Sequence, residues 1–499
     1  MTQASTPVAL TQALSRAVRT PLEHDRFDIH AELTALLAEV GFSPEDCGGE
    51  VRFNGLDPLM PSVVRLGGSA ALGLAQQSVV AAKLWRMRGG AGQNISIELA
   101  QAIRRLAPAT ERKWELLNGY PASIPDPVIT SYLDFFPTRD GRTVLPANIY
   151  PGIKSKMLEV LDCADNPQAL RRAIARHDAD ALETLGEEQG IVMAKIRSLE
   201  EFLETEAYAY LANRPLIEIE KIADSAPEPL PTHGLQPLSG IRALGMGHVI
   251  AGAGIGRSLA SLGADVLNVW RPRQTEHDAI YCTANVGMRS TRLEPREKRG
   301  AAHLRALLEQ ADIFFANRRP RLLTELGLDL QTATKIRPGL IHVTVSTHGE
   351  GGPWAKRVGF DQVAGAVTGM VVAEGTLEKP KLPPTGIVND YLVAWLGATG
   401  AMVALARRAT EGGSYRVHVS LSRAALWILS LGLFDKGYVK SVAGTAGAHA
   451  LIDPELFTAR TSCGVYQGVT ENVFMSATPR RFETVLVPRG SSDAVWLPR

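Results

Sequence analysis

The sequence is poor in the features that mark secreted or zinc-binding proteins. Only four cysteines occur among the 499 residues, and they are Cys47, Cys163, Cys282 and Cys463. They lie too far apart to form a zinc motif or a disulfide framework. Free thiols are typical of a reducing compartment, so we expect a cytoplasmic protein that holds no metal ion.

A long apolar run and a large net charge are also missing. The most apolar stretch, Tyr391 to Ala406, is shorter than the roughly 20 residues that a membrane span needs, so it predicts a buried helix. The start of the chain lacks the charged-then-apolar order of a secretory signal. Lys plus Arg number 53 and Asp plus Glu number 52, a balance that gives no polyanion-binding surface. We therefore expect neither nucleic acid nor a membrane as a partner.

What the chain does contain is material for a large core and a sharp change of pattern. Apolar residues make up 45% of the sequence. Residues 224–238, "DSAPEPLPTHGLQPL", are rich in proline and predict a linker. Before it, residues 1–223 include a region, about 110–223, that we expect to form a smaller α+β domain. After it come a domain at 239–435 and a segment at 436–499 that looks strand-rich.

The domain at 239–435 alternates strands with helices. "IRALGMG", "ADVLNVW", "DIFFAN" and "GLIHVTVST" have the composition of buried strands, and amphipathic segments of helical length separate them. This alternation predicts an α/β fold with a doubly wound, Rossmann-like parallel sheet.

One unit of the sequence occurs twice. "LWRMRGGAGQNISIELAQA" at 84–102 and "ARRATEGGSYRVHVSLSRA" at 406–424 each predict the end of a helix, a glycine turn and a strand. Gly90 matches Gly412, and Asp390 then matches Gly68. Duplication is a better explanation than chance, and the chain is predicted to be a fused tandem whose first copy is degenerate.

A parallel sheet of this kind suggests a nucleotide ligand, but the dinucleotide fingerprint is absent. The glycines near 245–256 never give G-x-G-x-x-G, because position 257 is Arg257. Arginines follow successive strands instead, and these are Arg271, Arg273, Arg289, Arg292, Arg296, Arg318, Arg319 and Arg321. Arginines at strand ends favour a ligand rich in phosphate, such as NADP or coenzyme A. A solvated basic face is the competing explanation.

Asp390 in "GIVNDYLVAWLG" precedes the most apolar helix. Two explanations of this carboxylate compete. It can cap the helix, because Asp and Asn accept hydrogen bonds from the free N–H groups of a first turn. It can also be a reactive group, which a helix N-terminus would help to keep ionised.

Several segments together resemble the class III CoA-transferases, a family that includes formyl-CoA transferase, carnitine CoA-transferase and the related alpha-methylacyl-CoA racemase. The matching segments are "IRALGMGHVIAGAGIGRSLASLGADVLNVWRP", "NVGMRSTRLE", "ADIFFANRRPRLLTELGL", "IRPGLIHVTVSTHGEGGPWAKRVGFDQVAGAVTGM" and "EGGSYRVHVSLSRAA". They cover about residues 239–430 in order.

The resemblance implies that coenzyme A moves between an acyl-CoA thioester and a carboxylic acid. It implies that Asp390 is the nucleophile and passes through an aspartyl anhydride and an aspartyl thioester. It also implies a set of residues that contact coenzyme A: Ile250, Ala251, Arg271, Arg273, Leu293, Arg296, Asn317, Arg318, Arg319 and Arg357. Family members form interlocked dimers, so we expect a homodimer or, if the tandem folds on itself, a pseudo-dimer within one chain.

Three other functions stay open. A 2-methylacyl-CoA racemase or epimerase needs a proton-carrying pair, but Phe360 stands where the racemase pattern "GHD" has histidine. The family pattern usually has "AGP" where this chain has "AGA" at 251–253, and a strand-end Glu where this chain has Trp270. A catalytically inactive binding protein would explain these departures. An NADP oxidoreductase is disfavoured by the missing glycine fingerprint.

Overall fold

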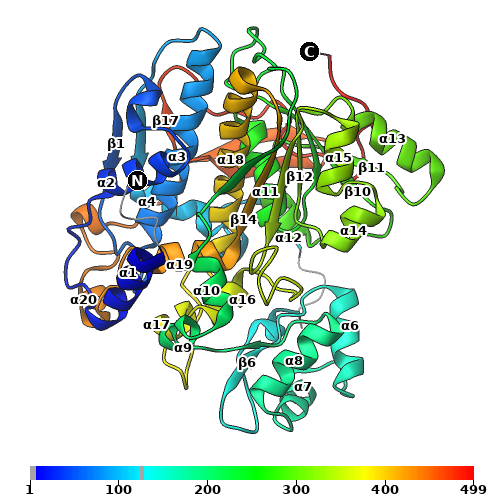
Figure 1. Cartoon of the computed structure of the whole chain (residues 1–499). Helices are drawn as coiled ribbons and strands as arrows, with labels where there is room; N and C mark the ends of the chain where they lie inside the picture. The colour runs from blue at the N-terminus through cyan, green and yellow to red at the C-terminus, as the bar shows by residue number, and fades with distance from the viewer. Residues whose placement is uncertain (1–6, 124–128, 499) are drawn as a thin grey trace.

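The centre of the molecule is a seven-stranded sheet (Figure 1). The computed structural model describes residues 7–123 and 129–498. The strands run in the order β11-β10-β9-β12-β13-β14-β8, and all but β8 are parallel to their neighbours. Their bounds are β8 Glu218–Ala223, β9 Arg242–Met246, β10 Asp265–Trp270, β11 Arg289–Arg292, β12 Ile313–Ala316, β13 Ile341–Ser346 and β14 Ser414–Ser420. The six parallel strands have the Rossmann order 3-2-1-4-5-6, which confirms the predicted fold class.

Helices cover both faces of this sheet, as a doubly wound fold requires. Helices α11 (Ala251–Ser261) and α18 (Asn389–Glu411) pack on one face, and α13 (Lys298–Leu308), α14 (Pro320–Glu325) and α15 (Leu330–Ile336) pack on the other. Alternate strand residues therefore enter different cores. Phe315 belongs to the core beneath α11 and α18, whereas Phe314 belongs to the core beneath α13–α15.

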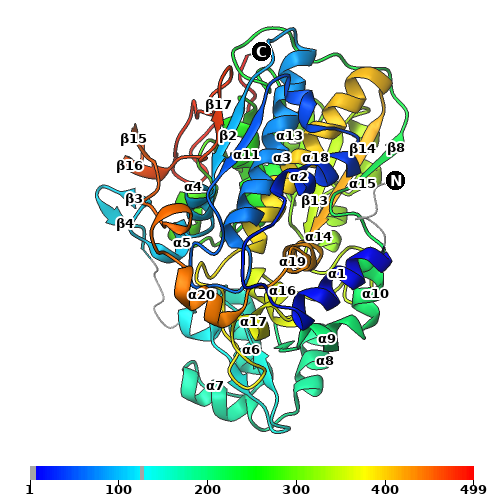
Figure 2. The same ribbon diagram turned by 90° about the vertical axis from the view of Figure 1, so that its left-hand side faces the viewer.

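The repeated unit is present in the structure, and its two copies lie in contact. Helix α3 (Leu66–Met87) and strand β2 (Ile95–Glu98) are the first copy, and α18 and β14 are the second. A Cβ atom at Gly73 of α3 would lie only 3.0 Å from the Leu392 side chain of α18, so the two helices approach closely. Figure 2 shows the first copy beside α18. Strand β2 pairs with β1 (Val51–Asn54) and with β17 (Phe474–Met475) from the end of the chain.

A smaller α+β domain projects below the sheet in Figure 1. Its strands are β5 (Phe136–Pro137), β6 (Thr143–Leu145) and β7 (Ala194–Lys195), and its helices are α6 (Pro151–Val160), α7 (Pro167–Ile174) and α8 (Ala179–Gln189). These elements enclose a hydrophobic core of their own. Helices α9 (Leu199–Leu203) and α10 (Glu206–Ala212) lead from it to β8.

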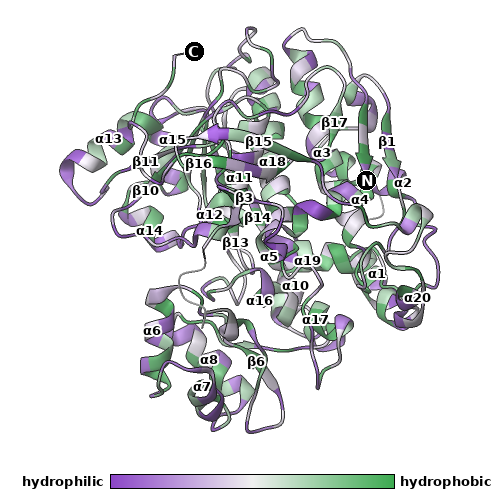
Figure 3. Cartoon of the chain, turned by 180° about the vertical axis from the view of Figure 1, so that it is seen from behind, coloured by the Kyte–Doolittle hydropathy of each residue, from purple (hydrophilic) through white to green (hydrophobic). Residues whose placement is uncertain are grey.

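The remaining elements surround this frame. Residues 224–238 contain no helix or strand. A third small sheet has the order β15-β16-β3-β4 and is visible from behind in Figure 3. The bounds not yet given are α1 Pro7–Arg19, α2 Ile29–Glu39, η2 Pro44–Cys47, α4 Leu99–Ala102, η3 Ile103–Leu106, α5 Pro108–Glu111, β3 Leu116–Leu117, β4 Tyr120–Pro121, η4 Ile129–Leu133, α12 Asp278–Ala284, α16 Asp361–Val367, α17 Met370–Glu374, α19 Leu421–Ser430, α20 Lys436–Val442, η5 Gly447–His449, β15 Leu456–Thr461 and β16 Gly464–Val469. In the part of the chain that the structure describes, no helix combines the length and apolarity needed to cross a bilayer.

Candidate active site

Asp390 lies in the first turn of α18. Because α18 ends beside the start of β14, its first turn lies at the carboxyl ends of the parallel strands, where doubly wound folds bind their ligands. The residue is 5% exposed. Within residues 7–123 and 129–498, its carboxylate accepts no hydrogen bond, and Val388 occupies the N-cap position. Asp390 therefore does not cap the helix.

Asp361 performs the capping from another segment. It opens α16, and its Oδ2 atom accepts hydrogen bonds from the backbone N–H groups of Val388 (3.0 Å) and Asp390 (2.7 Å). These are two of the N–H groups that a helix start leaves without partners inside the helix. No sequence motif pointed to this role of Asp361, because it lies 29 residues before Asp390 and only the fold brings the two together.

The two carboxylates are electrostatically coupled. Burial raises the pKa of Asp361 to about 6, even though its hydrogen bonds to backbone N–H groups oppose the shift. Burial and then the charge of Asp361 raise the pKa of Asp390 well above its usual range. Because donors stabilise only the Asp361 charge, we expect Asp361 to ionise first and Asp390 at higher pH.

Tyr150 connects the small domain to this site. It immediately precedes α6, and its hydroxyl donates a 2.6 Å hydrogen bond to Glu276, which follows β10. Its ring stacks on Phe360 at a centroid distance of 5.8 Å. Burial, Glu276 and, to a smaller extent, Asp390 raise the pKa of the Tyr150 phenol, so it remains a hydrogen-bond donor at neutral pH. Neither Tyr150 nor Glu276 lies in a motif that predicted a functional role.

The loop between β9 and α11 is held in a strained conformation. Val249 has a φ of 56°, which is unusual for a β-branched residue. Glu276 accepts its N–H at 2.8 Å, and Asn317 bonds to both the N–H (3.0 Å) and the C=O (2.7 Å) of His248. Strain of this kind persists where several contacts fix the backbone, and it is common at ligand-binding loops.

Four of the ten residues assigned to coenzyme A border this loop. Ile250 and Ala251 begin α11, while Asn317 and Arg318 follow β12. Strands β9 and β12 are neighbours at the point where the strand order reverses, the usual ligand crevice of a Rossmann sheet. Arg318 donates to Met246 O at 3.0 Å. Burial lowers the Arg318 pKa to about 10, so it stays positively charged at neutral pH.

Four further residues follow neighbouring strands. Arg271 and Arg273 come after β10, where Arg273 is exposed. Leu293 comes after β11 and is buried in the core beneath α13–α15. Arg296 is exposed and forms a 2.7 Å ion pair with Glu325.

Arg319 and Arg357 face the small domain instead. Arg319 donates to Gly190 O at 3.3 Å. Arg357 forms ion pairs with Glu187 (2.9 Å) and Glu183 (3.0 Å), both on α8. The guanidinium of Arg357 is therefore already occupied by two carboxylates.

The first copy of the repeat has an equivalent cap but no carboxylate that corresponds to Asp390. Asp57 accepts hydrogen bonds from the N–H groups of Gly67 (3.1 Å) and Gly68 (2.6 Å) at the start of α3. Gly68 occupies the position of Asp390, and a Cβ there would lie 3.0 Å from the side chain of Arg65. Arg65 is fully buried and pairs with Asp25. A charged side chain therefore fills the space beside the first helix start.

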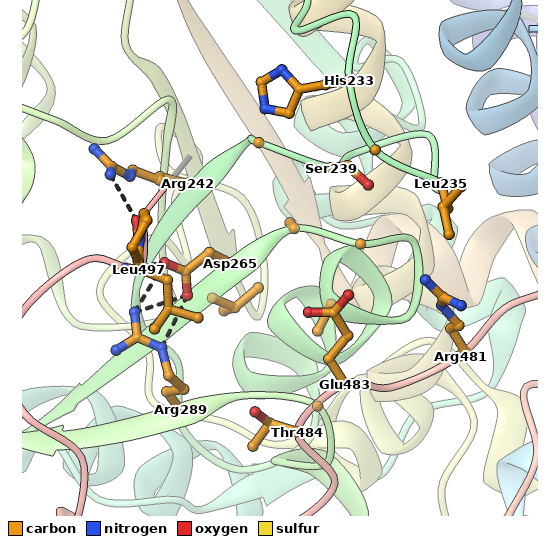
Figure 4. Close-up of a pocket in the computed structure, with 18 residues that line it drawn as sticks. His233, Leu235, Ser239, Arg242, Asp265, Arg289, Arg481, Glu483, Thr484 and Leu497 are labelled. Carbon is orange, nitrogen blue, oxygen red and sulfur yellow. Dashed lines mark hydrogen bonds and ion pairs between the residues drawn. The ribbon is translucent and has the colours of Figure 1, made fainter.

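A cavity of about 320 Å³ lies at the opposite edge of the sheet (Figure 4). Its wall includes Arg242, Asp265 and Arg289, which begin β9, β10 and β11. Asp265 accepts hydrogen bonds from Arg289 and from the N–H of Leu497. This cavity is therefore separate from the site around Asp390. Among the described residues, no three His, Cys, Asp or Glu side chains are grouped to hold a metal ion.

This geometry predicts that Asp390→Asn stabilises the fold. Folding raises the pKa of Asp390. The carboxylate therefore does not lower the free energy of unfolding below its unfolded-state pKa near 4, and it lowers that free energy increasingly as the pH rises from there through the folded-state pKa. Urea unfolding should show a gain on the order of 1 kcal/mol at about pH 8, and a smaller gain at about pH 5. In an Asp361→Asn background the gain should shrink, because one source of repulsion is gone. A loss of stability at pH 8 would contradict this electrostatic account.

Residues 238–483 are similar to a family of known proteins. A family model described as CoA-transferase family III matches that range. The succinyl-CoA–L-malate CoA-transferase alpha subunit of Chloroflexus aurantiacus is 30% identical over 243 residues, which are 44% of this chain and 57% of that protein. The succinyl-CoA:glutarate CoA-transferase of Mus musculus is 28% identical over 182 residues, which are 34% of this chain and 42% of that protein. The chain spans about half the length of these curated relatives.

Two solved structures are also similar. Rv3272 from Mycobacterium tuberculosis, in a D175A mutant, is 26% identical, with a TM-score of 0.36, over 39% of this chain and 56% of that chain. A CAIB/BAIF family protein from Brucella suis is 24% identical, with a TM-score of 0.37, over 46% of this chain and 65% of that chain. Residues 238–483 of this chain are therefore similar to CoA-transferase family III and to curated CoA-transferases.

Proposed function

We propose that the protein transfers coenzyme A from an acyl-CoA thioester to a carboxylic acid, with Asp390 as the covalent nucleophile. The observation that carries this proposal is the buried Asp390 carboxylate, which stands at the ligand edge of a family III domain and has no capping role. Asp361 already caps α18, so helix stability gives no reason for a second, costly carboxylate.

The proposed reaction proceeds through anhydrides. The Asp390 carboxylate attacks the thioester carbonyl, and the C–S bond breaks to release the coenzyme A thiolate. The thiolate attacks the aspartyl carbonyl of the mixed anhydride, which leaves an aspartyl thioester and frees the donor acid. The acceptor carboxylate then displaces the thiolate to form a second anhydride. The thiolate finally attacks the acceptor carbonyl and restores Asp390.

The surroundings of Asp390 suit this chemistry in two respects. Burial excludes water, which would otherwise hydrolyse the anhydride. The N-terminus of a long helix favours the ionised nucleophile and partly offsets its raised pKa. The Tyr150 hydroxyl and the Phe360 ring border the site from the small domain and from the segment before α16. Phe360 cannot carry a proton, which disfavours a racemase.

We also propose that one chain forms a pseudo-dimer. Both copies of the repeat contribute to one continuous core, and α3 packs against α18 within the chain. The small domain reaches the Asp390 site through Tyr150 of the same chain. Only the second copy carries the carboxylate, so a single active site per chain is expected.

Asp390→Asn tests the nucleophile. An amide cannot form the anhydride, so exchange of labelled coenzyme A between acyl-CoA and carboxylate should fall by about 1,000-fold or more, with circular dichroism unchanged. Asp361→Asn is the matched control, because Asn can still accept one N–H bond at the helix start and should retain measurable exchange. Normal exchange in Asp390→Asn would refute covalent catalysis by this residue. No exchange in the wild type with a broad panel of acyl-CoA donors would instead favour an inactive binding protein.

Calorimetry with coenzyme A tests the phosphate site. We expect coenzyme A to bind more tightly than dephospho-coenzyme A, and Arg271→Ala to weaken binding about 10-fold, the usual cost of a charge-assisted hydrogen bond. Arg357→Ala removes the same charge and is the control, because Glu183 and Glu187 already occupy that guanidinium. An equal loss of affinity for coenzyme A in both variants would mean that net charge alone attracts the ligand. Absence of binding would remove the coenzyme assignment.

A further inference from the structure

A second cluster of reactive side chains lies at the ends of β13 and β14. The Ser346 Oγ atom is 3.1 Å from Nε2 of His418, and Nδ1 of His418 is 3.2 Å from Oε1 of Glu350. Serine, imidazole and carboxylate thus follow one another in the order found in serine hydrolases. Ser346 and His418 come from the adjacent strands β13 and β14, and Glu350 comes from the loop after β13.

The hydrogen bonds around His418 favour one tautomer. Thr344 Oγ1 donates to Glu350 at 2.6 Å, so its oxygen can accept from the Nδ1–H of His418, 3.0 Å away. With the proton on Nδ1, the lone pair of Nε2 faces the Ser346 hydroxyl. An imidazole in this state is a general base for the serine. The N–H of Gly349 donates a 2.9 Å hydrogen bond to Ser346 Oγ, which favours negative charge that develops on this oxygen as it loses its proton.

This cluster lies on the face of the sheet opposite to α18. A Cβ at Gly400 or Gly397 of α18 would approach the side chains of Val417 or Val419, so these valines point toward α18. His418, between them in β14, therefore points to the other face. Asp390 and the cluster share one edge of the sheet but not one face, which makes them separate sites.

Burial and charge also fit a nucleophile and its base. His418 is fully buried, Ser346 is half-buried and the Glu350 side chain is 31% exposed, so the cluster is not closed off from solvent. Burial alone would raise the Glu350 pKa, but His418, Thr344 and Arg416 together hold it well below its usual range. Arg416 bridges Glu350 (2.8 Å) and Glu218 (3.2 Å), so its charge is already balanced.

We propose that Ser346, His418 and Glu350 form a second catalytic site that hydrolyses uncharged carboxylic esters or thioesters. Ser346 Oγ bonds to the acyl carbon while His418 Nε2 takes the hydroxyl proton. The bond from the acyl carbon to the leaving oxygen or sulfur breaks, and that atom receives the proton from His418. Water then attacks the acyl-serine with His418 again as base, which releases the acid and restores Ser346.

The alternative is that these bonds only anchor the loop after β13, and the two roles differ in one measurable property. An anchoring serine is no more nucleophilic than any other serine, whereas a triad serine reacts with alkyl fluorophosphonates. The probe is therefore ethyl alkylfluorophosphonate, added to the full-length protein, with the modified peptide identified by mass spectrometry. We expect a phosphonyl adduct on Ser346 with loss of fluoride.

Matched variants identify the base. Labelling should slow by about 100-fold in His418→Gln and by about 10-fold in Glu350→Gln, as when triad members are removed. Ser420→Ala is the control. Ser420 of β14 is the register partner of Ser346 of β13, and its substitution should leave the labelling rate unchanged. Thermal unfolding checks that each variant is folded. If His418→Gln does not fold, the labelling rate of Glu350→Gln decides the result, because Glu350 is partly exposed.

Two results would overturn the proposal: no adduct on Ser346 with excess probe, or an adduct that forms equally fast without the His418 imidazole or the Glu350 carboxylate. The test is independent of coenzyme A transfer. Asp390→Asn protein should label at the wild-type rate, so failure at one site does not imply failure at the other.

Discussion

The pair of hydrogen bonds from Val388 and Asp390 N–H to Asp361 determines the chemistry of the candidate site. A helix start needs an acceptor, and Asp361 supplies it from a neighbouring segment. The side chain of Asp390 is therefore not needed to cap the helix. The same arrangement places two carboxylates close together in a buried space, which raises the Asp390 pKa and makes the site costly for the fold. A group that burdens the fold in this way is a strong candidate for function.

The first copy of the repeat separates these two roles. Asp57 bonds to the N–H groups of Gly67 and Gly68 at the start of α3, and Asp361 bonds to those of Val388 and Asp390 at the start of α18. In both copies an aspartate from outside the helix therefore caps its first turn. The carboxylate that corresponds to Asp390 is absent from the first copy, and Arg65 occupies the neighbouring space. An aspartate outside the helix, Asp57 or Asp361, is therefore enough to cap it, and the carboxylate of Asp390 is not needed for capping. The first copy then serves the second by packing α3 against α18.

Sequence patterns predicted the frame of the fold but not the contacts that complete the site. Apolar strands alternating with helices identified the sheet, whereas β11 was hidden because its residues, Arg289 to Arg292, are polar. Strand β8 was missed because it precedes the linker and joins the sheet as an antiparallel edge. Asp390 was identifiable from the helix that follows it and from family resemblance. Tyr150 was not, because its partner Glu276 is 126 residues away and only the tertiary fold brings them together.

The covalent state of Asp390 during turnover is the most direct test of the account. Protein incubated with an acyl-CoA donor and quenched with hydroxylamine should carry a hydroxamate on the peptide that contains Asp390, because hydroxylamine cleaves an aspartyl thioester or anhydride. Peptide mapping by mass spectrometry locates the modification. The account predicts a hydroxamate at Asp390 that depends on acyl-CoA. Unmodified Asp390 in a protein that is actively exchanging coenzyme A would contradict it.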